Sequence, residues 1–181
     1  PITDYNLRGG KDKNGRTYWY FNKDVSYEFG YGLSYTTFEY SNFSINKNSI
    51  TPNDKITISA DVKNTGSVDG DEVVQVYMRT PDSPASLERP IKRLKGFQRV
   101  TIAAGQTRTV SIDIDCSDLW FWDGEKERIT FDPGRYVFEI GASSKDIKGT
   151  VEATMSGTYN SVLKTVVAEC GKVGLKPGNT V

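Results

Sequence analysis

Strict alternation of apolar and polar residues predicts β-strands along most of the chain. The clearest case is residues 56–62, where Ile56, Ile58, Ala60 and Val62 alternate with polar side chains. A period of two is typical of a strand with one face in a core and the other in water. The same period recurs within residues 72–79, 107–116 and 136–140, and apolar residues also cluster around Gly96. These segments are therefore predicted strands.

The first strand is predicted to begin at Phe38. Its apolar positions slip by one residue near Asn42, as a β-bulge would make them do. Turn-forming stretches at 64–70, 81–90 and 132–134 separate the later strands, and no long amphipathic helix is present. About seven regularly spaced strands predict an all-β fold, a two-sheet antiparallel sandwich over residues 38–155.

The two flanks of this sandwich differ from it in composition. Residues 1–37 are rich in glycine, aromatic residues and charge, without a clean period, and we interpret them as an ordered connector that lies on another surface. Residues 156–181 are interpreted as an incomplete C-terminal extension, in which 162–168 favours one more strand. Because the chain starts without Met in a polar segment, we expect it to be a piece of a longer polypeptide.

The charge balance narrows the choice of partners. The chain has 23 Lys and Arg against 23 Asp and Glu, so its formal net charge is zero. This removes the electrostatic reason to expect nucleic acid or an anionic membrane as a partner. No apolar stretch approaches the length of a membrane span.

Several kinds of catalytic and cofactor site are excluded by residue type. The chain contains no His, which excludes a Ser-His-Asp or Cys-His centre and any His-ligated metal. Two cysteines cannot form a Cys-only zinc site, and no phosphate-binding glycine motif leads into a helix. We therefore expect no metal and no cofactor.

Paired carboxylates are the remaining catalytic chemistry, since glycoside hydrolysis needs only two. The candidates in turns or on polar strand faces are Asp69, Asp71, Glu72, Asp113, Asp115 and Asp118. We interpret these as solvated charges that also discourage edge pairing. Asp4 and Glu28 lie in the connector and are candidates to face a neighbour's cleft. No catalytic residue is assigned.

Two features, a pair of tryptophans and a cysteine, each allow two interpretations. Trp120 and Trp122, separated by one residue, point to the same face of an extended chain and are either core or inter-domain contacts, or a platform for sugar stacking. Cys116 is in phase with Ile112 and Ile114, which indicates a buried core thiol. A disulfide from Cys116 to Cys170 would instead need the tail to fold back onto that strand.

A series of motifs, in order over about residues 1–145, resembles one known family. The motifs are Gly15-Arg16-Thr17-Tyr18, the run Tyr27-Glu28-Phe29-Gly30-Tyr31-Gly32-Leu33-Ser34-Tyr35, Asn64-Thr65-Gly66, Gly70-Asp71-Glu72-Val73-Val74, Arg89-Pro90-Ile91-Lys92-Arg93, Asp118-Leu119-Trp120-Phe121-Trp122-Asp123 and Pro133-Gly134-Arg135-Tyr136. They resemble the C-terminal fibronectin type III-like domain of family 3 glycoside hydrolases, of the β-xylosidase and β-glucosidase type. The opening residues 1–8 are similar to the stretch just upstream in those branches.

The resemblance implies an immunoglobulin-like or fibronectin type III-like sandwich within a longer retaining exo-β-glycosidase. In that family a barrel-like domain supplies an Asp nucleophile and an α/β domain commonly supplies the Glu acid/base, and neither segment is matched here. Ser117-Asp118-Leu119-Trp120 is superficially similar to the nucleophile motif, but it aligns with the late strands of the sandwich, so that role is not assigned to Asp118.

The role that the resemblance implies is a non-catalytic accessory domain that stabilises and positions upstream catalytic domains of the same polypeptide. It also implies a periplasmic or secreted location and plant polysaccharide or oligosaccharide as a further candidate partner. The candidate interface residues are Arg16, Tyr18, Trp19, Tyr27, Phe29, Tyr31 and Tyr35. Two alternatives are an independent carbohydrate-binding module and a generic protein-interaction domain, which would have a disordered and dispensable connector.

Overall fold

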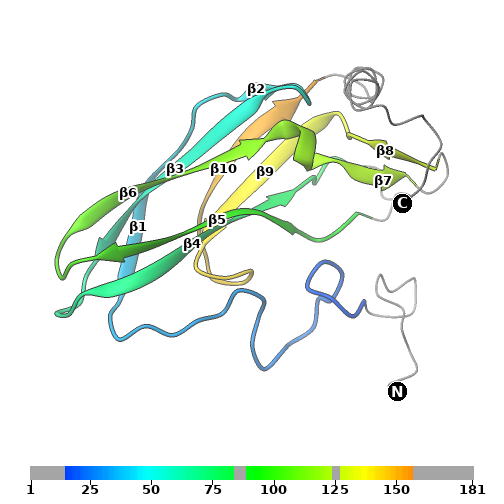
Figure 1. Ribbon diagram of the computed structural model, residues 1–181. Coiled ribbons are helices and arrows are strands. Elements are labelled where there is room, and N and C mark those ends of the chain that lie inside the picture. The colour runs from blue at the N-terminus through cyan, green and yellow to red at the C-terminus, as the bar shows by residue number, and fades with distance from the viewer. Residues whose placement is uncertain (1–14, 84–88, 124–126, 157–181) are drawn as a thin grey trace, which may run out of the picture.

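The strands of the chain form two packed sheets and a short two-stranded ribbon (Figure 1). This arrangement is seen in a computed structural model that describes residues 15–83, 89–123 and 127–156. The three-stranded sheet has the order β1-β3-β6 and the five-stranded sheet the order β2-β10-β9-β4-β5. The strands are β1 (Phe38–Ile45), β2 (Ser49–Ile50), β3 (Lys55–Asn64), β4 (Gly70–Arg79), β5 (Arg93–Ile102), β6 (Thr107–Asp115), β7 (Phe121–Asp123), β8 (Arg128–Thr130), β9 (Gly134–Gly141) and β10 (Ile147–Met155).

The three-stranded sheet confirms the predicted alternation. In β3 the apolar residues from Ile56 to Val62 are buried while their neighbours lie on the outer face. β3 pairs antiparallel with β6 and with β1, and the β1 register shifts between Ser41 and Ser44. Asn42 takes a positive φ of 53° at this point, so the predicted bulge is confirmed.

The core lies between the two sheets. Its largest fully buried side chains include Tyr136, Phe138 and Ile140 of β9, which face Ile56 and Ile58 of β3 across the sandwich. Gly96 of β5 has no room for a side chain, because an added Cβ would meet the Cγ2 atom of Ile112 at 2.5 Å. Two sheets packed face to face around one core are the sandwich that the strand pattern predicted.

The central strand β4 is buried on both faces, which period two alone does not explain. Val74, Val76 and Met78 point into the core as predicted. Gln75 and Tyr77 point outward, yet they are only 4% and 0% exposed. They are covered by the connector at Phe29 and Gly30, so the outer face of β4 is buried at these two positions.

Two elements were not predicted. β10 completes the five-stranded sheet next to β9, and β2 adds a two-residue parallel pair at its edge. The alternation in β10 is weak because two of its inward positions are Gly149 and Ala153. An added Cβ at Gly149 would meet the ring of Phe43 at 2.4 Å, so this position has no room for a side chain. The predicted strand at 162–168 lies outside the described residues.

The buried side-chain amide of Asn64 holds the Asn64-Thr65-Gly66 turn in place. The Asn64 side chain donates to the carbonyl oxygens of Val68 and Ile102, at 2.8 and 2.9 Å. Its Oδ1 atom accepts from the Thr36 hydroxyl and from the Gly66 amide, at 2.6 and 3.0 Å. All four hydrogen bonds open to an amide side chain are therefore made, which fixes the start of β1 to the β3–β4 turn.

Cys116 begins a short 3₁₀ helix, Cys116–Leu119, and is fully buried and free. The predicted core thiol is confirmed, while Cys170 lies outside the described residues. Burial raises the pKa of the Cys116 thiol to about 11. A buried, protonated thiol is a poor nucleophile.

We expect Cys116 in the folded chain to resist aromatic disulfide reagents at pH 8 and to react fully once the chain is unfolded in guanidinium chloride. A Cys170→Ser background isolates its signal. Rapid labelling of the native Cys170→Ser chain would contradict the buried placement of Cys116.

Candidate functional site

The most unusual surface of the described chain is an apolar strip on the connector. Every second residue from 27 to 35 carries a large apolar side chain that is at least 44% exposed. One of them, Phe29, also packs against the rings of Tyr18 and Tyr77. The strip consists of Tyr27, Phe29, Tyr31, Leu33 and Tyr35, which are 74%, 44%, 45%, 88% and 101% exposed. The expectation that the connector has no clean period is wrong for this segment, since it alternates with its apolar side outward.

The residues between the strip positions fasten it to the sandwich. The Gln75 amide donates to Gly30 O at 3.0 Å, and the amide of Ser144 donates to Phe29 O at 2.9 Å. The Ser143 hydroxyl donates to Glu28 Oε1 at 2.9 Å. Polar groups of the sandwich thus bind the inner side of the connector, and the exposed strip residues remain free to contact another surface.

The preceding part of the connector is fixed by aromatic contacts. The Tyr18 ring stacks on Phe29 with 4.0 Å between centroids, and its hydroxyl accepts from the Leu94 amide at 2.9 Å. The amide of Ile91 donates to Trp19 O at 2.6 Å. Tyr18 also meets the ring of Tyr77 edge-on at 6.2 Å. The strip therefore rests on a rigid support.

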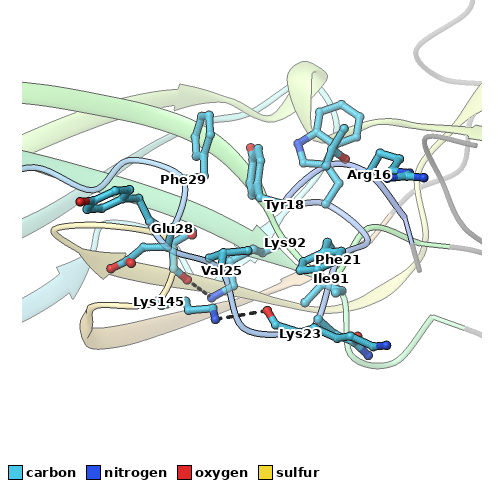
Figure 2. Close-up of a pocket in the computed structure, with 15 residues that line it drawn as sticks. Arg16, Tyr18, Phe21, Lys23, Val25, Glu28, Phe29, Ile91, Lys92 and Lys145 are labelled. Atoms are coloured by element: carbon cyan, nitrogen blue, oxygen red, sulfur yellow. Dashed lines mark hydrogen bonds between the residues drawn. The ribbon is translucent and has the colours of Figure 1, made fainter. Parts of the chain in front are cut away.

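An open groove of about 1170 Å³ lies beside Tyr18 and Phe29 (Figure 2). Most of its lining residues belong to the connector, and Ile91, Lys92 and Lys145 of the sandwich complete it. The ammonium group of Lys92 forms an ion pair with the buried Glu139 and donates to Ser144 O. The groove thus combines aromatic and aliphatic side chains with lysines, one of which is neutralised by Glu139.

The predicted interface residues are partly brought together. Arg16, Tyr18, Trp19, Tyr27 and Phe29 all line the groove of Figure 2. Tyr31 lies against Tyr27, with 5.3 Å between ring centroids. Tyr35 is set apart at the far end of the strip and is fully exposed. Their role in an interface stays a prediction.

Trp120 and Trp122 differ in their surroundings. Trp120 follows the 3₁₀ helix and is half-buried against the core, whereas Trp122 lies on β7 and is 47% exposed. The residue between them, Phe121, points inward and is buried. Both tryptophans line one small pocket, and their role in sugar stacking stays a prediction.

The candidate carboxylates serve structural hydrogen bonds. Asp71 binds Thr101 and Arg99, and Asp113 binds Thr57 and Lys55, which in each case lowers the pKa of the carboxyl. Burial raises the pKa of Glu72, whose carboxylate accepts from the Tyr40 hydroxyl at 2.9 Å. Asp69 accepts from the Ala104 amide at 2.9 Å. These contacts hold neighbouring strands and turns together.

Two of the remaining candidate carboxylates lie at the 3₁₀ helix. Asp115 is the last residue of β6 and precedes the helix without a side-chain capping hydrogen bond, and Asp118 lies in the helix, where its backbone oxygen accepts from Lys95. Asp4 lies outside the described residues. Over the ranges that the structure describes, no group of three Asp, Glu, Cys or His side chains is placed to hold a metal ion. Within the same ranges no helix is long and apolar enough to cross a membrane.

Sequence reasoning missed the residues that anchor the connector and the loop before β5. Arg93 lies between the rings of Trp19 and Trp120, with its guanidinium carbon 5.1 Å from each centroid. Arg89 forms a bidentate pair with Asp132, at 2.6 and 2.9 Å. Both arginines belong to the Arg89-Pro90-Ile91-Lys92-Arg93 motif, but nothing local in that motif identifies their distant partners.

Comparisons with known proteins agree with this architecture. Residues 72–144 match the model of the fibronectin type III-like domain. A β-xylosidase from Formosa agariphila is 42% identical over 140 residues, which are 76% of this chain and 19% of the relative. A periplasmic β-glucosidase from Salmonella typhimurium is 40% identical over 122 residues, 67% of this chain and 16% of the relative.

Solved structures show the same relationship. A β-glucosidase from Kluyveromyces marxianus superposes with a TM-score of 0.66 at 41% identity, covering 75% of this chain and 16% of that one. The GH3 β-glucosidase of Bifidobacterium adolescentis gives a TM-score of 0.65 at 34% identity, with 74% and 19% covered. The chain thus spans less than a fifth of the length of these relatives. Its sandwich is a fibronectin type III-like domain of the family 3 glycoside hydrolases.

Proposed function

We propose that this chain is a non-catalytic accessory part of a retaining exo-β-glycosidase that removes terminal β-xylose or β-glucose. Its role is to stabilise and position the catalytic domains of the same polypeptide. The observation that carries the proposal is the outward apolar strip from Tyr27 to Tyr35 on a connector that is hydrogen-bonded to the sandwich. Exposure of such a strip to water is unfavourable in free energy, and a domain that covers the strip removes this cost.

The support beneath the strip makes it suitable for docking. A flexible tail would lose conformational freedom when a partner bound it, at about 0.5–1.5 kcal/mol for each immobilised side chain. The strip is ordered in advance by Gln75 and Ser144, so more of its burial contributes to association. The alternative of a generic interaction domain predicts a disordered connector, and these hydrogen bonds favour an ordered one.

The relatives support the polypeptide context. The sequence covers only part of each glycosidase it matches, which leaves room in those proteins for separate catalytic domains. One relative is named a periplasmic β-glucosidase, which supports a periplasmic or secreted location for the parent of this chain. Oligosaccharide is then the substrate of the neighbouring domains.

The proposal is tested by comparing the accessibility of the strip in two proteins. We expect hydroxyl-radical footprinting to label Tyr27, Leu33 and Tyr35 strongly in the 181-residue chain and about tenfold less in the complete polypeptide, because docking removes them from water. Trp122, which is 47% exposed on β7 and lines a pocket whose described walls include no strip residue, is the comparison site within the same protein. Equal labelling of the strip in both proteins would overturn the proposal.

The absence of catalysis has its own test. The purified 181-residue chain is expected to give no turnover of an aryl β-xyloside or aryl β-glucoside above the buffer rate. The physical reason is that Asp71, Asp113 and Glu72 are held in structural hydrogen bonds. Measurable turnover that disappears on Glu72→Gln would contradict the non-catalytic assignment.

A further inference from the structure

All three tryptophans of the chain line one small pocket. Trp19 comes from the connector, Trp120 from the end of the 3₁₀ helix and Trp122 from β7. The pocket has a volume of about 200 Å³. Its other walls are Tyr20, Arg89, Pro90, Arg93 and Phe121. Residues about 100 positions apart in sequence thus form one aromatic site.

The walls of this pocket are fixed by cation–π contacts. Arg93 stacks between Trp19 and Trp120, at 5.1 Å from each, and donates a hydrogen bond to Trp120 O. Arg89 lies 4.8 Å above the Phe121 ring and is held by Asp132. A site whose side chains are already ordered loses little freedom when a ligand enters.

The chemistry of the lining selects a kind of ligand. The guanidinium and indole groups are hydrogen-bond donors, and none of the described residues that line the pocket is a carboxylate. A matching ligand must therefore present oxygen acceptors together with an apolar face that lies flat on an aromatic ring. A pyranose ring has both, since its axial C–H groups form an apolar face and its hydroxyls lie around the edge.

The size of the pocket restricts the ligand further. Sites for drug-sized molecules measure about 300–1000 Å³, so 200 Å³ suits one ring rather than a chain of sugars. Trp122 is the best stacking surface because it is 47% exposed, whereas one face of Trp120 is already covered by Arg93.

We propose that this pocket binds a single pyranose unit of an oligosaccharide. The ring stacks on Trp122, and its hydroxyl oxygens accept hydrogen bonds from the guanidinium group of Arg93. This adds sugar recognition to the domain, on a surface distinct from the apolar strip. The site does not depend on the proposed docking of that strip.

The tryptophans provide a direct assay, because every one of them lines the site. Methyl β-xyloside, methyl β-glucoside and methyl β-glucuronide are titrated into the 181-residue chain while its fluorescence is recorded. We expect a saturable change with a Kd on the order of 1 mM for at least one glycoside. A preference for the glucuronide would identify the ligand as a carboxylated pyranose, and a preference for the xyloside or the glucoside would identify a neutral one.

Variants then locate the binding, with ligand-observed NMR saturation transfer as a readout that does not need Trp122. Trp122→Ala is expected to weaken binding at least tenfold. Phe97→Ala, which removes a more exposed aromatic residue elsewhere, is expected to leave binding unchanged. No saturable change up to about 50 mM of any glycoside, or equal binding by Trp122→Ala and Phe97→Ala, would overturn the proposal.

Discussion

Asp132→Ala is expected to lower the free energy of unfolding of the chain by about 3–5 kcal/mol. The Asp132 and Arg89 side chains are only 10% and 9% exposed. The carboxylate accepts two hydrogen bonds from Arg89 and a third, at 2.6 Å, from the Ser83 hydroxyl. Truncation leaves the buried guanidinium without the carboxylate that accepts its hydrogen bonds, which is why the effect is large. Urea denaturation measures it.

The matched control is Asp71→Ala. Asp71 also pairs with an arginine, Arg99, but these side chains are 34% and 72% exposed. Solvent screens such a pair, and the expected loss is below about 1 kcal/mol. Equal losses for Asp132→Ala and Asp71→Ala would contradict the structural role of the buried pair.

Lowering the pH should weaken the ion pair between Asp132 and Arg89. Burial alone would raise the pKa of Asp132, but the hydrogen bonds from Arg89 and Ser83 outweigh it and lower the pKa below its usual value. Asp132 therefore contributes stability that is complete above the unfolded-state pKa, near 4, and is lost as pH falls through the lower folded-state value. Asp132→Asn should flatten the pH dependence of the urea midpoint between about pH 5 and 2. An unchanged slope would contradict this assignment.

Gly30→Ala is expected to destabilise the chain by about 2 kcal/mol or more. Gly30 has φ of +81°, where an alanine is strained, and an added Cβ would collide with the amide oxygen of Gln75. The substitution should displace the connector and break the hydrogen bond from Gln75 to Gly30 O. Thermal unfolding gives the loss of stability, and hydrogen exchange at Ser144, whose amide binds Phe29 O, gives the displacement.

Gly32→Ala is the control for Gly30→Ala. Gly32 lies two residues along the same segment, and an added Cβ would meet nothing within 4 Å. Its expected effect is within about 0.5 kcal/mol. If both substitutions behaved alike, the close contact between Gly30 and β4 would be contradicted.

Alternation in the sequence was sufficient to predict the strands whose two faces differ clearly. β3 and β6 have a polar outer face, and even the bulge at Asn42 could be seen from the slip in period. β10 was not predicted from the sequence, because the small residues Gly149 and Ala153 occupy two of its inward positions. The burial of Tyr77 on an outer face depends on the connector, which is a tertiary effect.

The candidate surface was predicted from its aromatic composition rather than from its geometry. The period of two from Tyr27 to Tyr35 is present in the sequence, but its direction is set by polar partners such as Gln75 and Ser143. The aromatic pocket forms because the fold brings the three tryptophans and Arg93 together, and no local sequence pattern predicts that they lie side by side.

The central claim is that the apolar strip docks onto the rest of the polypeptide. Its most direct test is the melting temperature of one triple variant, Tyr27→Ser with Leu33→Ser and Tyr35→Ser, in two proteins. The 181-residue chain should keep its Tm, because these side chains are 74–101% exposed in it. The complete polypeptide should lose several degrees. Unchanged Tm in both proteins, or the same loss in both, would contradict the claim.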